Sequence, residues 1–68
     1  MLGDQIKYLR HLHKISQVKL AEEIGVAKQT VSNWENNNIM PSVELLKKLS
    51  IYFSCSTDYL LELNQGST

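Results

Sequence analysis

Residues 16–35 read SQVKLAEEIGVAKQTVSNWE, which contains two short helical patterns separated by three residues that begin with a glycine. Ser16 is a good N-cap for the first pattern, because its hydroxyl can accept a hydrogen bond from a backbone N–H of the first turn. Apolar residues then recur on one face at helical spacing, at Leu20, Ala21 and Ile24. The pattern stops at Gly25, a residue type that adopts a positive φ without steric cost. This stretch therefore predicts a helix of barely two turns that ends in a tight turn.

The second pattern, over 28–35, has only two apolar residues for a buried face, Val31 and Trp34. It follows so soon after Gly25 that the turn fixes the two helices at a large crossing angle, as in a helix-turn-helix. Ala21 lies where the two helix axes approach most closely, and a larger side chain there would push the helices apart. We therefore expect a helix-turn-helix in this part of the chain.

The outward side of the second helix is almost entirely hydrogen-bonding. Its outward and flanking positions carry amides, hydroxyls and one lysine: Lys28, Gln29, Thr30, Ser32 and Asn33. Short amides and hydroxyls have only average helix propensity, so their use on a helix surface needs a reason. An amide offers a donor and an acceptor in one rigid fork that matches the major-groove edge of adenine, and a lysine can reach the acceptors of guanine. The sequence therefore predicts that this helix reads bases in the major groove.

Three further helical patterns flank this pair, and no stretch alternates cleanly in the manner of a strand. A first helix runs to about His13, with an apolar stripe formed by Leu2, Ile6, Leu9 and Leu12. Pro41 breaks the chain and Ser42 caps a fourth helix, with the apolar residues Leu45, Leu46, Leu49 and Phe53. Thr57 caps a fifth helix, with Leu60, Leu61 and Leu63. The patterns predict an all-α five-helix bundle over 1–63, and a flexible tail or the start of a linker over 64–68.

Size and composition narrow the class of protein. The 68 residues include seven Lys and Arg, seven Asp and Glu, and 43% hydrophobic residues, which suits one small domain. A chain of this size buries only about 60% of its extended surface and cannot also enclose a deep active-site cavity. No nucleophile is spaced near a base, and there is no phosphate loop, so we expect no enzyme.

The single cysteine, Cys55, excludes an intramolecular disulfide. The start of the chain lacks the basic and apolar segments of a secretory signal, and no apolar stretch approaches the length of a membrane span. We therefore expect a cytoplasmic protein with no membrane partner, and no cofactor or small-molecule ligand is evident.

The balanced total charge hides an uneven distribution. Residues 1–34 carry five basic and three acidic side chains, a balance of plus two, and residues 35–68 carry minus two. Between Gln5 and Ala21 there is no acidic residue. Such asymmetry indicates one electropositive face, although solvated charge clusters of this kind are also common.

Together these residues resemble the helix-turn-helix DNA-binding domains of the phage Cro and repressor type, the Xre-like family. The resemblance extends from Gly3 to about Leu63. It rests on motifs at fixed spacing: Ser16-Gln17, Leu20-Ala21, Gly25-Val26, Val31-Ser32-Asn33-Trp34-Glu35, Pro41, Leu45, Leu49 and Thr57-Asp58-Tyr59-Leu60-Leu61. The resemblance implies a lambda-repressor-like five-helix bundle that binds double-stranded operator DNA sequence-specifically, commonly as a homodimer and commonly for transcriptional repression.

Carried over residue by residue, the resemblance assigns two groups of DNA contacts. The base-reading residues are Lys28, Gln29, Ser32 and Asn33, of which Lys28 could turn to a phosphate instead. The phosphate-binding residues are Gln17, Thr30, Asn36, Asn38 and Arg10. Gln17 begins the second helix, where the helix N-terminus adds its own positive end.

Arg10 and Glu35 resemble an ion pair that, in some family members, ties the first helix to the end of the third and aims the arginine at the DNA backbone. The helical wheel supports the pair independently. Glu35 sits beside Val31 on the inward edge of its helix, and Arg10 borders the Ile6 side of the first helix. Removing one partner of a buried pair costs about 3 to 5 kcal/mol.

Two positions depart from the family pattern. Ala27 stands where family members usually have Ser or Thr, and losing that N-cap costs about 1 kcal/mol. The same change removes a candidate phosphate contact. Asn37 stands where the family prefers Gly, two residues after Glu35, and asparagine can also adopt the left-handed conformation. We therefore expect both the turn and the fold to survive.

Several residues admit a second interpretation. His11, His13 and Cys55 could be metal ligands, but residues two apart on a helix point about 200° apart, so we expect no metal site. Trp34 could stack on a base, but it shares the apolar side of its helix, which favours the core. Cys55 is more simply a small buried or interfacial hydrophobe.

The function and the dimer surface also leave alternatives open. A protein of this fold could instead be an antitoxin-like or adaptor domain that binds another protein, in which case its affinity for DNA would not depend on salt. The last two helices hold more apolar residues than one small core needs. Candidates for a dimer surface there are Tyr52, Phe53, Cys55, Tyr59 and Leu63.

Overall fold

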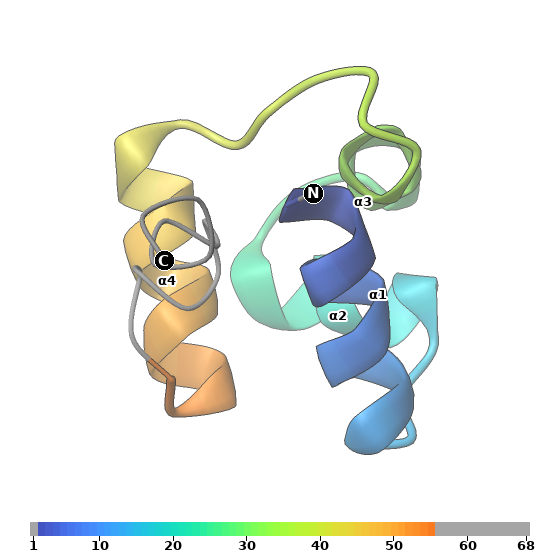
Figure 1. Cartoon of the computed structure of the whole chain (residues 1–68), viewed down its shortest axis with the longest axis vertical. Coiled ribbons are helices and arrows are strands. Elements are labelled where there is room, and N and C mark those ends of the chain that lie inside the picture. The colour runs from blue at the N-terminus through green and yellow to red at the C-terminus, as the bar shows by residue number, and fades with distance from the viewer. Residues whose placement is uncertain (1, 56–68) are drawn as a thin grey trace, which may run out of the picture.

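The computed structural model describes residues 2–55, and every regular element in that range is an α-helix. The helices are α1 (Leu2–Leu12), α2 (Gln17–Ile24), α3 (Lys28–Glu35) and α4 (Val43–Phe53), as Figure 1 shows. They confirm the all-α fold and the first four helices expected from the sequence. The fifth helix, expected after Thr57, and the tail over 64–68 lie outside the described residues. No helix in residues 2–55 has the length and apolar character needed to span a membrane.

Side-chain caps define two of the helix starts that the sequence predicts. Ser16 caps α2, and its Oγ accepts a hydrogen bond from the backbone N–H of Lys19 at 3.0 Å. Ser42 caps α4 in the same way, accepting from the N–H of Leu45 at 3.3 Å. Ala27 takes the extended N-cap conformation before α3 but makes no side-chain bond there, as expected for a residue without a hydroxyl.

The turn between α2 and α3 depends on Gly25. Its backbone has φ 93° and ψ 35°, in the left-handed region that glycine adopts without steric cost. The N–H groups of Gly25 and Val26 both donate to the carbonyl of Ala21, at 2.8 and 2.9 Å. These bonds end α2, and the chain enters α3 after only three residues. The predicted helix-turn-helix is therefore confirmed.

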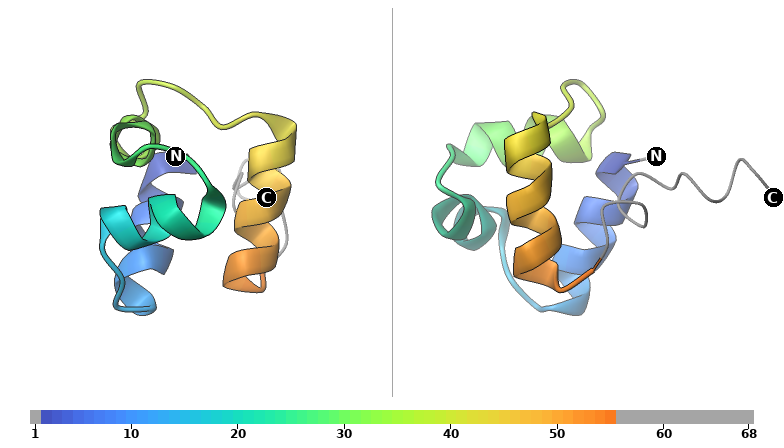
Figure 2. Two further views of the ribbon diagram at one scale, coloured as in Figure 1. Left: turned by 180° about the vertical axis from the view of Figure 1, so that it is seen from behind. Right: turned by 90° about the vertical axis from the view of Figure 1, so that its left-hand side faces the viewer.

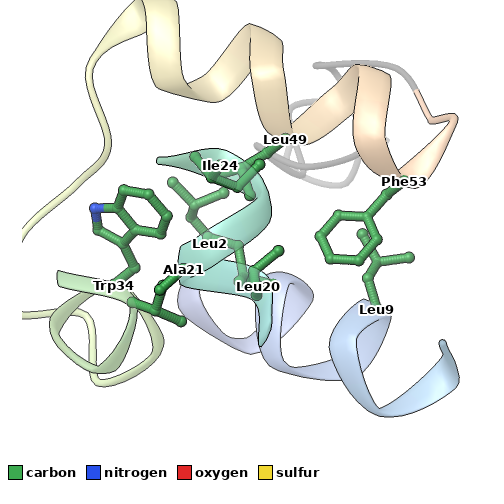
Figure 3. Close-up of a cluster of buried hydrophobic side chains, with 10 residues drawn as sticks. Leu2, Leu9, Leu20, Ala21, Ile24, Trp34, Leu49 and Phe53 are labelled. Atoms are coloured by element: carbon green, nitrogen blue, oxygen red, sulfur yellow. The ribbon is translucent and has the colours of Figure 1, made fainter. Parts of the chain in front are cut away.

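One apolar core joins the four helices. It contains buried side chains from each of them: Leu2, Ile6, Leu9, Leu20, Ala21, Ile24, Val31, Trp34, Leu49 and Phe53. Trp34 is only 2% exposed, and Figure 3 shows it among these side chains. Trp34 is therefore a core residue, as predicted, and does not stack on a base.

The packing of the helices places α3 at the periphery. α3 packs against both α1 and α2, whereas α4 packs against α2. Both views in Figure 2 show α3 at the edge of the molecule, with the connection from α3 to α4 passing outside the core. One side of α3 is therefore left uncovered by the other described helices.

Two expectations about apolar residues are wrong. The sequence places Leu12 in the apolar stripe of α1, but its side chain is 58% exposed. At about 100° per residue, Leu12 turns away from the line of Ile6 and Leu9, and α1 ends there. Phe53, a candidate for a dimer surface, is only 4% exposed and belongs to the core. The candidates Tyr59 and Leu63 lie outside the described residues.

Replacing Gly25 by alanine should lower the free energy of unfolding by about 1 to 2 kcal/mol, because a Cβ disfavours a positive φ. Apart from its chain neighbours, no atom lies within 4 Å of that Cβ, so the expected cost is backbone strain alone. Urea unfolding followed by circular dichroism measures the change. Gly25→Asn is the control, since asparagine tolerates this conformation better and should lose less stability. Equal losses in both variants would contradict this explanation of the turn.

Candidate nucleic-acid interface

α3 has one buried side and one polar side. Val31 is fully buried and Trp34 nearly so, and both belong to the core. The candidate DNA-contacting residues of the helix are less covered: Lys28 and Gln29 are exposed, and Thr30, Ser32 and Asn33 are half-buried. These candidates therefore share the side of α3 that the core does not use.

The side chains of Gln29 and Asn33 lie one helical turn apart and bond to each other. Gln29 Nε2 donates to Asn33 Oδ1 at 3.2 Å. The bond uses one N–H of Gln29 and one lone pair of Asn33, so the Gln29 carbonyl and the Asn33 NH2 keep their capacity for other partners. α3 thus presents an acceptor and two donors next to one another on its uncovered side.

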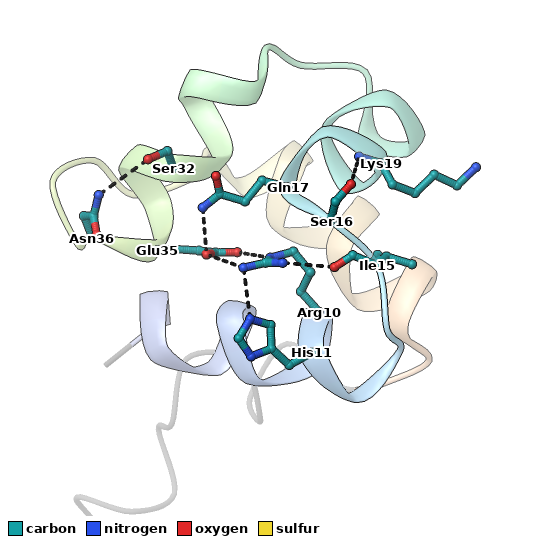
Figure 4. A network of polar contacts seen from close by, with 9 residues as sticks. All are labelled: Arg10, His11, Ile15, Ser16, Gln17, Lys19, Ser32, Glu35 and Asn36. Atoms are coloured by element: carbon teal, nitrogen blue, oxygen red, sulfur yellow. Dashed lines mark hydrogen bonds and ion pairs between the residues drawn. The ribbon is translucent and has the colours of Figure 1, made fainter.

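The loop after α3 continues this polar surface. Asn36, Asn37 and Asn38 are all exposed. Asn36 Nδ2 donates to Ser32 Oγ at 3.5 Å, which couples the loop to α3 (Figure 4). The backbone N–H of Asn38 donates to the carbonyl of Asn33 at 2.9 Å. The two candidate phosphate-binding residues of the loop, Asn36 and Asn38, are therefore each bonded to a candidate base-reading residue of α3.

Gln17 is the first residue of α2, where backbone N–H groups without intrahelical partners form the positive end of the helix dipole. It is half-buried, and its Nε2 donates to Glu35 Oε1 at 3.0 Å. Because Glu35 is the last residue of α3, this bond holds the start of α2 against the end of α3. The candidate phosphate contact on α2 is therefore joined directly to the helix predicted to read bases.

Arg10 and Glu35 form an ion pair that joins α1 to α3 (Figure 4). Arg10 Nε donates to Glu35 Oε2 at 2.6 Å, and Arg10 Nη2 donates to Glu35 Oε1 at 3.1 Å. The two residues are buried, at 9% and 6% exposure. Arg10 Nη1 also donates to the carbonyl of Ile15 at 2.9 Å, and His11 Nε2 lies 3.2 Å from Arg10 Nη2. The structure thus brings the two residues together, while a phosphate contact by Arg10, whose guanidinium is engaged inside the protein, remains a prediction.

The surroundings of Glu35 keep its carboxyl charged. Burial by itself raises the pKa of Glu35, but hydrogen bonds from Arg10 and Gln17, together with the positive charges of Arg10 and Lys7, outweigh that effect. The pKa of Glu35 therefore lies below its ordinary value of 4.5. No buried side-chain nitrogen or oxygen in the described part of the chain lacks a hydrogen-bond partner. The buried polar network is thus fully satisfied.

Sequence reasoning missed three contacts of this region. They are the bond from Gln17 to Glu35, the contact of His11 with Arg10, and a bond from the backbone N–H of Gly3 to Asn37 Oδ1. Each of these contacts forms only because of the tertiary packing or because of the rotamer that a side chain adopts. Only the bond from Gly3 to Asn37 had a signal in the sequence. Asn37 carries an amide side chain at a turn position where the family prefers glycine.

His13 and Cys55 pack against the core, whereas His11 is exposed and contacts Arg10. Among residues 2–55 there is no group of three His, Cys, Asp or Glu side chains that could hold a metal ion. His13 contacts the ring of Phe53 edge-on, with ring centroids 5.1 Å apart. Cys55 is half-buried against the core, and burial raises the pKa of its thiol.

α2 and α3, joined by the tight turn at Gly25, form a helix-turn-helix, and α3 is the helix whose polar side is left uncovered. A family model described as Helix-turn-helix matches residues 6–60 of the chain. The chain therefore belongs to the helix-turn-helix family.

Known proteins resemble this chain in sequence and in structure. Repressor protein C2 of Salmonella phage P22 is 37% identical over 68 residues, which is 100% of this chain and 32% of that protein. A crystal structure of the P22 c2 repressor in complex with a synthetic operator has a TM-score of 0.85 at 37% identity, covering 88% of this chain and 91% of that chain. A crystal structure of SinR, a master regulator for biofilm formation, in complex with DNA has a TM-score of 0.82 at 39% identity, covering 90% and 98%. The chain thus spans about a third of the full-length P22 repressor.

The protein should lose stability in acid as Glu35 becomes protonated. Because the pKa of Glu35 is lower in the folded state than in the unfolded state, its contribution is complete above the ordinary pKa of 4.5 and is lost as the pH falls through the folded value. Gln17→Ala removes one of the hydrogen bonds that lower this pKa in the folded state, so the total loss should be smaller and should be complete at a higher pH. Urea unfolding from neutral pH down to about pH 3 measures the effect.

Gln29→Ala is the matched control, since the Gln29 side chain is exposed and bonds to Asn33, not to a carboxylate. This variant should keep the acid dependence of the unsubstituted protein. If Gln17→Ala also keeps it, the hydrogen bond from Gln17 does not hold the pKa of Glu35 down.

Proposed function

We propose that this chain is a sequence-specific double-stranded DNA-binding domain of a transcriptional regulator, and that the regulator is a repressor. The observation that carries the proposal is the uncovered side of α3, where the bonded pair of Gln29 and Asn33 presents an acceptor beside two donors. The P22 relative, which is named a repressor and has been crystallised with a synthetic operator, supports it. Other relatives are named as transcriptional regulators, so we propose no catalytic step.

Four residues of α3 read bases in this proposal. Adenine presents an acceptor and a donor side by side in the major groove, and these match the Asn33 NH2 and the Gln29 carbonyl. Lys28 is exposed at the first residue of α3, where it can reach the acceptors of guanine. Ser32 lies on the same side and can donate to or accept from either kind of base.

Five residues around α3 bind phosphates in this proposal. They are Gln17, Thr30, Asn36, Asn38 and Arg10. Gln17 has the N-terminal end of α2 behind it, where the helix dipole favours an anion. Such contacts fix the position of the protein on the duplex but carry no sequence information themselves.

We further propose that two copies bind together. A single domain of this size buries too little surface for tight operator binding. Two copies on half-sites about 34 Å apart would place both α3 helices on one face of the duplex.

Selection of bound oligonucleotides from a random pool tests the proposal. The protein should enrich one sequence, and its affinity should fall linearly with the logarithm of the salt concentration, with a slope of about −0.9 per phosphate neutralised. No enrichment, together with a flat salt response, would favour a protein-interaction module of the same fold.

Substitutions in α3 should change which sequence is preferred. In Gln29→Ala and in Asn33→Ala, discrimination at one base pair should fall by about 1 to 3 kcal/mol, because an amide that matches the base edge is lost. Competition binding against operators with single base changes measures the discrimination. Asn38→Ala is the matched control, since it removes an amide proposed to bind phosphate and should weaken all sequences alike. An unchanged preference in both α3 variants would show that α3 does not read the bases.

A further inference from the structure

Asn37 occupies an unusual backbone position at the end of α3. Its φ is 61°, a left-handed value that glycine usually supplies at the end of a helix. Its backbone N–H donates to the carbonyl of Trp34 at 3.0 Å, and the N–H of Asn38 donates to the carbonyl of Asn33 at 2.9 Å. These two bonds pair the carbonyls of Asn33 and Trp34 near the end of α3. Glycine would serve the backbone here at least as well, so the amide side chain has another use.

The side chain of Asn37 bonds to the start of α1. Its Oδ1 accepts a hydrogen bond from the backbone N–H of Gly3 at 3.0 Å. Gly3 is the second residue of α1, so its N–H has no partner within the helix. Asn37 therefore caps α1 from a loop 34 residues further along the chain.

This junction is tightly packed. Gly3 is buried, and a Cβ on it would lie 2.7 Å from Asn37 Oδ1 and 2.8 Å from the carbonyl oxygen of Glu35, and closer still to that of Trp34. The amide end of α1 thus meets the carbonyl end of α3, an arrangement in which the two helix dipoles attract. Figures 1 and 2 show the beginning of α1 next to α3.

We propose that Asn37 is a positioning residue for DNA binding. Asn37 stands between Asn36 and Asn38, the two loop residues proposed to bind phosphate, and its bond to Gly3 fastens the middle of that loop to α1. This inference rests on the proposed function. A loop that is held before DNA arrives loses less conformational entropy on binding than a free one, so the bond strengthens binding without touching DNA.

The test compares two glycine substitutions in the 68-residue chain. Asn37→Gly keeps the left-handed turn and removes the oxygen that Gly3 uses. Ser54→Gly is the matched control. Ser54 has φ 56° at the end of α4, so this substitution also replaces a left-handed residue other than glycine by glycine. Both variants should fold, and urea unfolding establishes that each is folded under the binding conditions.

In Asn37→Gly, affinity for the selected operator should fall by about threefold to tenfold, the cost of ordering one or two loop side chains on binding. The slope of affinity against salt and the base preference should both stay the same, because the substitution removes neither a charge nor a base contact. The Gly3 amide, followed by nuclear magnetic resonance, should exchange with solvent several-fold faster. Ser54→Gly should match the unsubstituted protein in all four measurements.

The outcomes separate this inference from the proposed function. If the unsubstituted protein selects an operator and Asn37→Gly binds it with the same affinity, Asn37 serves only the stability of the fold and the positioning role is wrong. If the unsubstituted protein selects no operator, the proposed function fails and the positioning role fails with it. A changed base preference in Asn37→Gly would also overturn the proposal, because it would mean that Asn37 acts on the base-reading residues.

Discussion

The rest of the structure depends on the buried ion pair between Arg10 and Glu35. Taking two charges out of water costs several kcal/mol each, and the cost is offset only where partners and hydrogen bonds are complete. Both oxygens of Glu35 accept from Arg10, and Arg10 also donates to the carbonyl of Ile15. These bonds require one arrangement of α1, α3 and the connection from α1 to α2. The full set of bonds therefore forms only when these three parts of the chain are packed together as they are here.

α3 needs such a constraint because its own sequence provides few apolar contacts. Val31 and Trp34 are its only buried apolar side chains, and its N-cap makes no side-chain bond. An eight-residue helix is marginal in isolation, so tertiary contacts must fix it. Some of these tertiary contacts are polar and lie at the C-terminal end of α3. Glu35 bonds to Arg10, and the Asn37 side chain bonds to the start of α1. The outer side of α3 is thereby left available for binding.

The helices could be predicted from sequence because their signals are local. Ser16 and Gly25 act within their own turns, so their effect does not depend on the rest of the fold. The bond from Gly3 to Asn37 joins residues 34 apart, and they meet only because α1 packs on α3. The spacing of residues along the sequence does not predict this packing of α1 on α3. The error at Leu12 has the same origin, since a position at the edge of an apolar stripe is buried only if another element covers it.

The candidate interface also contains local contacts, which the sequence predicts, and contacts between helices, which it does not. Gln29 and Asn33 are one turn apart on a single helix, so their closeness follows from helical geometry alone. The bond of Gln17 to Glu35 joins two helices and could not be inferred from spacing. That bond uses one N–H of the Gln17 amide, and a second N–H remains for an acceptor such as phosphate. A phosphate contact by Gln17 is therefore compatible with the intact ion pair, and DNA could bind at the start of α2 without rearranging the network that orients α3.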